Sequence, residues 1–242
     1  MIRVLFFDVF GTVVDWRSGI LDAFTDAARR SGSDAYRTID RDTQRDVDWA
    51  AVTEDWRRAY PGAMLAARRE PQWQNLDTLQ ARTLSDVLDR HGVTLPADEH
   101  ALLVRAWREL PPWPDSRSGL TALRNRFTTA TLSNGHVALL VDLLRFGDLR
   151  FDAVLSAELA QSYKPDPVVY ERAAALLECP VEEAALVAAH PSDLAAASAV
   201  GMRTVFVRRQ DEWGPGTGAP EAPDLPGLVT VDTLGEVAAA LG

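Results

Sequence analysis

The sequence has one cysteine, Cys179, and lacks any apolar run long enough to cross a membrane. A single cysteine excludes an intramolecular disulfide and a metal site built from cysteines. The first residues also lack the basic region and apolar stretch of a signal peptide. Together these absences predict a cytoplasmic protein in which Cys179 is a structural thiol at a helix end.

Basic clusters are missing as well. The 242 residues carry 35 acidic side chains against 25 lysines and arginines, and the paired arginines fall within helical patterns. A chain with a net charge of −10 and no basic stripe is not expected to bind duplex nucleic acid or an anionic membrane. The length and the hydrophobic share of 47% suit one large domain, or a core with a smaller insert.

Apolar segments separated by helical patterns organise the chain. The first begins at Val4 and ends at Asp8, and a short last strand precedes a C-terminal helix. Between them lie four similar segments, over residues 127–133, 153–157, 185–189 and 203–207. Strands that alternate with helices predict an α/β fold with a doubly wound parallel sheet. The stretch 212–227 is rich in Gly and Pro, and we interpret it as a surface loop.

Residues 15–107 break this alternation, because they hold long amphipathic patterns and no convincing strand. The proline-rich segment LPPWPDS that follows is typical of a rigid linker. We therefore expect an α/β core of residues 1–14 and 108–242 with an inserted helical cap of residues 15–107. A cap over the carboxyl edge of the sheet would enclose a dry cleft.

Asp8 stands where the first apolar segment ends, and Gly11 and Thr12 follow it closely. Open α/β sheets bind ligands at this edge, which makes Asp8 a candidate nucleophile. An aspartate at a strand end also serves as a cap or turn residue, so the position alone does not decide. Position 10 is Phe10 and not a second aspartate. Because phenylalanine cannot transfer a proton, the pair points to a hydrolase that attacks carbon rather than phosphorus.

Polar side chains follow the later strands. Ser133 and Asn134 follow the second, Lys164 the third, and His190 and Asp193 the fourth. Each has an ordinary structural explanation: helix capping, a solvated surface lysine, a favourable helix dipole, and a hydrogen-bonded structural histidine. The functional interpretation places them in one site, where the lysine keeps the nucleophile ionised and stabilises oxyanions. We find no convincing metal cluster among the four histidines.

As an ordered set these motifs resemble the haloacid dehalogenase superfamily, and more closely its type II branch, the L-2-haloacid dehalogenases. The segments DVFGTVVDW, LSNG, YKPDPVVY and AAHPSD carry the resemblance, which covers essentially the whole chain. It implies a Rossmann-like core with a helical cap. It also implies a hydrolase that converts short 2-haloalkanoic acids to 2-hydroxy acids without a cofactor or a metal, with the haloacid and the halide ion as its small-molecule ligands.

The resemblance implies a role for each matched residue. Asp8 attacks the halogen-bearing carbon and forms an aspartyl ester, and Thr12 orients it. Lys164 and Asp193 support hydrolysis of the ester, while Arg57 of the cap receives the halide because a guanidinium stays charged and is weakly hydrated. The remaining matches contact substrate: Ser133 and Asn134 hold its carboxylate with amides near Val9 and Phe10, Tyr170 lines the site, and Trp113 is a further aromatic wall or only packing.

The chain also departs from better known members of the branch. They carry Ser and Asn where this chain has Ala188 and His190, and usually Tyr where it has Phe10. We expect His190 to supply part of the water-positioning network. The AAH variant resembles a subgroup with members active on fluoroacetate, and fluoride needs a strong hydrogen-bond donor to leave. Defluorination is therefore a hypothesis, and unchanged fluoride release by a His190→Ala variant would refute it.

Two other functions stay open on the sequence alone. One is a magnesium-dependent phosphatase of the same superfamily, which Phe10 disfavours. The other is a non-catalytic relative that binds a carboxylate, for which Ala188 leaves room. A homodimer through apolar faces of the cap helices is also open, because helix patterns do not separate an interface from a core.

Overall fold

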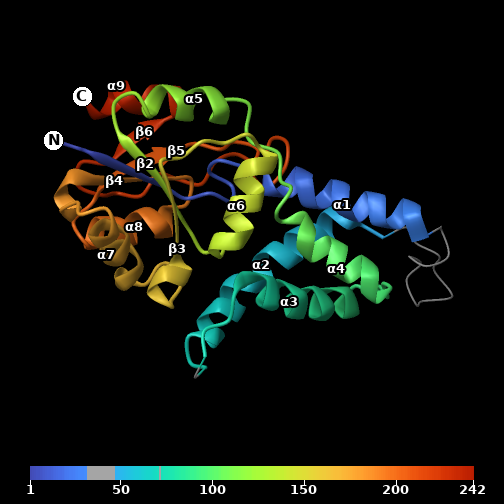
Figure 1. Ribbon diagram of the computed structural model, residues 1–242. Helices are drawn as coiled ribbons and strands as arrows, with labels where there is room; N and C mark the ends of the chain where they lie inside the picture. The colour runs from blue at the N-terminus through green and yellow to red at the C-terminus, as the bar shows by residue number, and fades with distance from the viewer. Residues whose placement is uncertain (32–46, 71) are drawn as a thin grey trace.

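The computed structural model describes residues 1–31, 47–70 and 72–242 (Figure 1). In these residues a six-stranded parallel sheet has the order β3-β2-β1-β4-β5-β6. Its strands are β1 (Val4–Phe7), β2 (Thr128–Ser133), β3 (Ala153–Ser156), β4 (Ala184–Ala188), β5 (Arg203–Val207) and β6 (Val229–Val231). The predicted α/β fold with a doubly wound parallel sheet is confirmed.

The central strand β1 is apolar on both faces. Leu5 and Phe7 belong to one hydrophobic cluster, and Val4 and Phe6 belong to the other. A strand that is buried on both sides needs a continuous apolar run, which explains the sequence VLFF.

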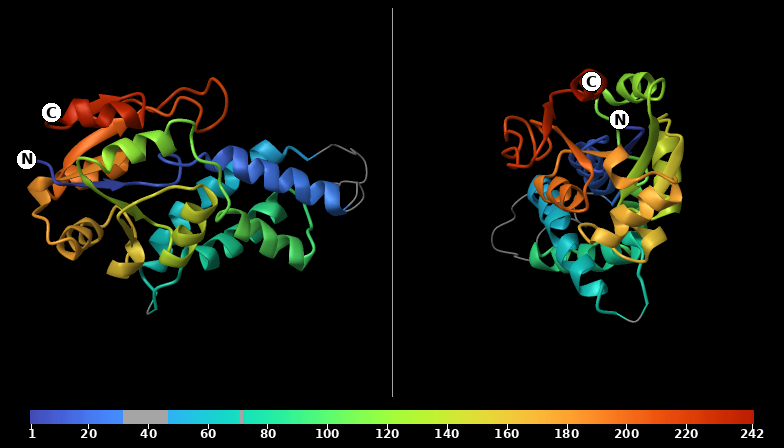
Figure 2. Two further views of the ribbon diagram at one scale, coloured as in Figure 1. Left: turned by 45° about the horizontal axis from the view of Figure 1, so that its top comes forward. Right: turned by 90° about the vertical axis from the view of Figure 1, so that its left-hand side faces the viewer.

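Helices cover both faces of the sheet (Figure 2). One face carries α5 (Ser116–Leu123), α6 (Val137–Phe146) and α9 (Val237–Leu241), and the other carries α7 (Pro167–Leu176) and α8 (Pro191–Ala199). Short 3-10 turns η1 (Ala157–Ala160), η2 (Val181–Glu183) and η3 (Leu234–Glu236) complete the described elements of this part. Because the crossovers pass over both faces, the carboxyl ends of the strands stay open to a ligand.

Between β1 and α5 the chain forms helices that pack against one another beside the sheet edge (Figure 1). They are α1 (Trp16–Ser31), α2 (Trp49–Ala67), α3 (Leu76–Arg90) and α4 (Ala97–Ala106). The outgoing and returning chains run side by side, since Trp113 N donates to Val13 O and Asp15 N donates to Pro111 O. The helices fall within residues 15–107, and the division into a cap and a core stays a prediction. No helix in the described ranges has the length and apolar character of a membrane span.

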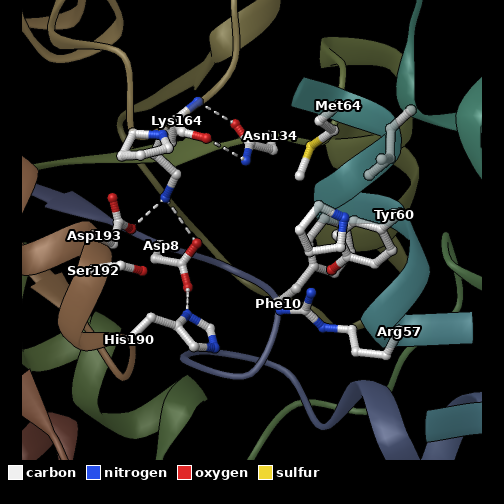
Figure 3. Close-up of a pocket in the computed structure, with 13 residues that line it drawn as sticks. Asp8, Phe10, Arg57, Tyr60, Met64, Asn134, Lys164, His190, Ser192 and Asp193 are labelled. Carbon is white, nitrogen blue, oxygen red and sulfur yellow. Dashed lines mark hydrogen bonds and ion pairs between the residues drawn. The ribbon is translucent and has the colours of Figure 1, made fainter. Parts of the chain in front are cut away.

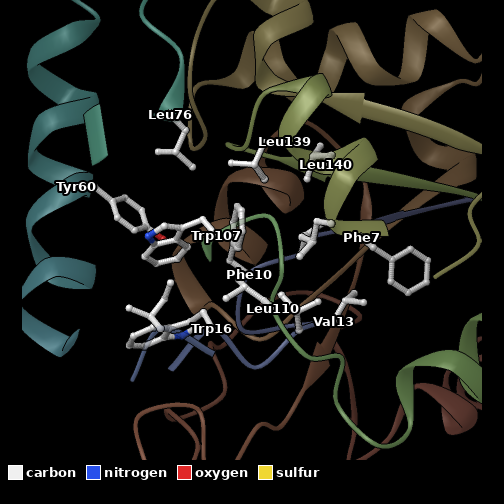
Figure 4. Packing of buried hydrophobic residues seen from close by; sticks show 14 of the residues in the cluster. Phe7, Phe10, Val13, Trp16, Tyr60, Leu76, Trp107, Leu110, Leu139 and Leu140 are labelled. Carbon is white, nitrogen blue, oxygen red and sulfur yellow. The ribbon is translucent and has the colours of Figure 1, made fainter. Parts of the chain in front are cut away.

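Aromatic packing joins these helices to the sheet (Figure 4). The ring of Phe10, just after β1, packs edge-on against Trp107 with 5.6 Å between ring centroids. Trp107 also stacks against Trp16 and contacts Tyr60 of α2 edge-on. Position 10 is therefore part of a hydrophobic cluster that holds α2 opposite the carboxyl end of β1.

Candidate active site

Asp8 directly follows β1 and is only 6% exposed. Lys164 Nζ donates to its Oδ1 at 2.9 Å, while Thr12 Oγ1 at 2.8 Å and His190 Nδ1 at 3.0 Å approach its Oδ2 (Figure 3). Burial opposes ionisation, but the charge of Lys164 and the hydrogen bond and charge of His190 outweigh it and hold the pKa of Asp8 well below its usual range. Asp8 is therefore an ionised carboxylate with both oxygens hydrogen-bonded.

Lys164 is buried between two carboxylates. Its Nζ lies 2.9 Å from Asp8 Oδ1 and 2.5 Å from Asp193 Oδ2. Burial favours the neutral amine, yet the charges of Asp193 and Asp8 raise the pKa of Lys164. Asn134 fixes the backbone here, because Lys164 N donates to Asn134 Oδ1 at 2.7 Å. Tyr170 Oη donates to the free oxygen of Asp193 at 2.5 Å, so this acid is held from both sides.

Glu212 was missed by the sequence analysis. Its Oε1 lies 2.9 Å from His190 Nε2 and accepts a hydrogen bond from Trp16 Nε1 at 3.0 Å. The side chain is 1% exposed, so the interpretation of residues 212–227 as a surface loop is wrong at its first residue. The available signal was an acid shortly after a predicted strand, at the edge where the other site residues gather.

His190 is held between the carboxylates of Asp8 and Glu212, so both ring nitrogens act as donors. Burial disfavours the imidazolium, but the charge of Glu212 and the hydrogen bonds to both acids outweigh it and raise the pKa of His190 to about 10. The contact between His190 and Glu212 also affects the acid. Burial would raise the pKa of Glu212, but the charge and hydrogen bond of His190 lower it, so this acid is ionised.

A cavity of about 220 Å³ opens in front of Asp8 (Figure 3). Its opposite wall is α2, from which Arg57, Tyr60 and Met64 face the acid. The Arg57 guanidinium lies 4.5 Å from the centroid of the Tyr60 ring and 5.5 Å from that of Trp16. Within the described part of the chain its Nε has no hydrogen-bond partner, and the guanidinium forms no ion pair with a carboxylate. The cavity therefore offers an incoming anion an unpaired cation opposite the carboxylate.

Comparison with known proteins identifies the family. The sequence profile of haloacid dehalogenase-like hydrolases matches residues 2–201. The chain belongs to this family of hydrolases. Within it the chain belongs to the L-2-haloacid dehalogenase branch, since it is 30% identical to (S)-2-haloacid dehalogenase 1 of Pseudomonas sp. strain CBS-3 over 86% of this chain and 85% of that protein.

Two solved structures agree with this assignment to the haloacid dehalogenases. The crystal structure of an L-2-haloacid dehalogenase is 34% identical and covers 100% of both chains with a TM-score of 0.84. That of a defluorinating L-2-haloacid dehalogenase is also 34% identical, covers 98% of this chain and 94% of its own, and has a TM-score of 0.85. The family drawn from the ordered motifs and the hydrolase class are confirmed.

Most of the candidate residues converge on the cavity. Those that line it are Asp8, Phe10, Arg57, Asn134, Lys164, His190 and Asp193. Four others lie outside the lining: Thr12, Trp113, Ser133 and Tyr170. No group of three or more His, Cys, Asp or Glu side chains in the described ranges is placed to hold a metal ion.

The candidates outside the lining support the site from behind. Thr12 Oγ1 donates to Asp8 and accepts from Ala189 N, which links β1 to β4. Trp113 Nε1 donates to the carbonyl of Gly11 at 2.9 Å, so its indole fixes the turn after Asp8 and does not form a cavity wall. Ser133 Oγ accepts from Gly135 N and does not cap α6, whose N-cap is His136.

Proposed function

We propose that this hydrolase removes halide from short 2-haloalkanoic acids through an ester on Asp8 and yields 2-hydroxy acids. The observation that carries the proposal is the placement of an ionised Asp8, bound by donors on both oxygens, across a cavity from the unpaired Arg57. The likeness to haloacid dehalogenases supports the substrate class.

In the first step an Asp8 oxygen attacks the halogen-bearing carbon. The new carbon–oxygen bond forms as the carbon–halogen bond breaks, and the halide leaves with the electron pair. In-line displacement puts the halide on the far side of the carbon from Asp8, where Arg57 extends from α2 (Figure 3). A halide leaves as a stable anion and needs no proton, which fits the phenylalanine at position 10.

In the second step water hydrolyses the ester at Asp8 Cγ. Lys164 stays beside the carboxyl group, so its ammonium stabilises the oxyanion that develops there. Asp193 keeps this ammonium in place, and Tyr170 holds Asp193. We assign the substrate carboxylate to the side of the cavity lined by Asn134, beside the turn after β1.

We further propose that fluoroacetate is a substrate, supported by the similarity to a defluorinating enzyme. The sequence motivated His190 as the residue that faces fluoride, but the contacts in the site favour Arg57. His190 contacts Asp8 on the attacking side, so it stabilises the nucleophile and not the departing halide. Arg57 lies on the side where the halide leaves, and we assign the fluoride donor to it.

An assay of halide release tests the proposed function. Wild-type protein is given both enantiomers of 2-chloropropionate, chloroacetate and fluoroacetate with a metal chelator present. We expect release from all but one enantiomer, and a hydroxy acid of inverted configuration, because attack inverts the carbon and hydrolysis at Cγ leaves it untouched. No release from any substrate, or phosphate-ester hydrolysis only with magnesium, would contradict the proposal.

Replacing Arg57 with Met tests the assignment of the fluoride donor. Fluoride is the poorest leaving group of the series and depends most on a charged donor, so fluoride release is expected to fall about 10²-fold or more. Bromide release from bromoacetate should fall less. Arg58→Met is the matched control, because Arg58 is the next residue of α2 and its exposed side chain pairs with Glu54. Equal losses for the two halides would refute the assignment.

A further inference from the structure

Glu212 is the outer end of a hydrogen-bonded chain that begins at Asp8. His190 links the two acids, with Nδ1 3.0 Å from Asp8 Oδ2 and Nε2 2.9 Å from Glu212 Oε1. Oε2 of Glu212 is buried and has no hydrogen-bond partner among the described residues. Burying a carboxylate with one oxygen unsatisfied costs free energy. The stabilising contacts of this acid are therefore all made by Oε1, with Trp16 and His190.

The turn after β1 is shaped to receive this acid. Gly11 has a φ of +85°, and a Cβ built on it would lie 2.3 Å from Glu212 Oε1 and 3.2 Å from His190 Cε1. Trp16 Nε1 donates to the same Oε1 at 3.0 Å. A glycine is thus required for the close approach of Glu212 to His190, in the same turn that carries the nucleophile.

We propose that Glu212 is a positioning residue that makes His190 the general base for hydrolysis of the Asp8 ester. This inference rests on the proposed function, because it requires an ester on Asp8. It assigns His190 to the second step, in which water must lose a proton as it attacks Cγ.

His190 changes its protonation state between the two steps. In the resting enzyme His190 donates to two carboxylates and cannot accept a proton. Esterification removes the charge of Asp8, so Glu212 is the remaining ionised partner of the ring. The Nδ1 proton then passes to solvent, which the 24% exposed side chain of His190 reaches.

Neutral His190 then acts on water. Nδ1 takes a proton as the water oxygen bonds to Asp8 Cγ, while Nε2–H stays on Glu212. His190 returns that proton to the departing hydroxy acid oxygen as the ester bond breaks. Asp8 is left as a carboxylic acid and gives its proton to Nδ1, which restores the resting state. One proton leaves the site for each halide released.

Charged groups on several elements set the pH at which His190 becomes a base. The charged groups around His190 are Asp8 in the turn after β1, Glu212 in the loop after β5, Arg57 of α2, Lys164 in the segment between β3 and α7, and Asp193 of α8. Glu212 raises the pKa of the imidazolium, and the two cations oppose it. Removing the charge of Glu212 is therefore expected to move the pH limb of ester hydrolysis to lower pH and to make the base weaker.

The experiment measures chloride release from chloroacetate by the Glu212→Gln variant in a rapid-quench assay. Glutamine keeps the shape and an acceptor oxygen but loses the charge. At a pH above the limbs of both proteins, we expect a burst of about one chloride per site at the wild-type rate, followed by turnover about 10²-fold slower. Intact-mass spectrometry should show the accumulated ester, with a mass increase equal to that of chloroacetic acid minus hydrogen chloride. If Glu212 acts through His190, the rise of the hydrolysis rate with pH should occur at lower pH in the variant than in wild type. A purely structural role would lower the maximal rate without moving that rise.

Controls separate the possible outcomes. Glu221→Gln removes an exposed charge from the same loop and should behave as wild type. Glu212→Asp keeps the charge, so its pH limb should stay near that of wild type, and it decides the question if the glutamine variant does not fold. Wild-type turnover by Glu212→Gln, or a slower burst with no adduct, would overturn the inference. No chloride from wild type would instead mean that the proposed function has failed.

Discussion

An Asp8→Asn variant is expected to lose halide release by at least about 10⁴-fold, because the amide cannot displace halide from carbon. The shape of the side chain is kept, and its single carbonyl oxygen can still accept from Lys164, while the amide nitrogen replaces the oxygen that accepts from Thr12. The assay is chloride release from L-2-chloropropionate under conditions where wild-type protein turns over many times.

The Asp8→Asn result needs two controls. Circular dichroism and thermal unfolding should show a folded protein, and intact mass should exclude conversion of the amide back to aspartate. A folded variant that keeps activity within about tenfold of wild type would remove Asp8 from the chemistry. Binding of a haloacid without turnover by either protein would favour a carboxylate-binding relative instead.

Replacing Lys164 with Met is expected to impair both activity and stability. Without its ammonium, Asp8 and Asp193 face each other as buried acids with no cation between them. Leaving buried charge uncompensated costs about 3–5 kcal/mol of the free energy of unfolding. Loss of the oxyanion partner lowers halide release by about 10²–10³-fold. Denaturant unfolding and the chloride assay measure the two effects separately.

A second substitution is expected to restore part of the stability lost in the Lys164→Met protein. Asp8 still pairs with His190 in the Lys164→Met protein, so adding Asp193→Asn removes the acid that is left without a cation. Part of the lost stability should return while activity stays low.

Arg58→Met removes exposed ion pairs with Glu54 and Asp55 and a contact with the Trp213 ring. It should change the free energy of unfolding by about 1 kcal/mol or less. Unchanged stability in the Lys164→Met protein would contradict the account of the buried ion pairs.

Local residue patterns were enough to predict the strands of the parallel sheet. The run ending at Asp8 is apolar because its strand is buried on both faces, and such a run can be read without knowing the fold. The order of the polar residues after these strands then placed Lys164 and Asp193 beside Asp8, as the topology of a parallel sheet requires. Lys164 is also the only lysine in the chain, a further signal that favours this placement.

What the sequence could not predict depends on contacts across long separations. Glu212 lies in a segment whose Gly and Pro content indicates exposure, and it is buried because the loop after β5 returns to the turn at Gly11. Trp113 looked equally suited to a cavity wall and to packing, and its hydrogen bond to the carbonyl of Gly11 places it behind the site. Neither outcome follows from residue type or spacing.

The central claim is that substrate carbon becomes bonded to Asp8, and labelled water tests it most directly. Wild-type protein in excess over L-2-chloropropionate is allowed one turnover in oxygen-18 water, and a second sample is allowed many turnovers. The account predicts unlabelled product from the first turnover and oxygen-18 in the carboxylate of the Asp8 peptide afterwards, because water attacks Cγ. Labelled product in the first turnover with no label in Asp8 would contradict it, since water would then have displaced the halide itself.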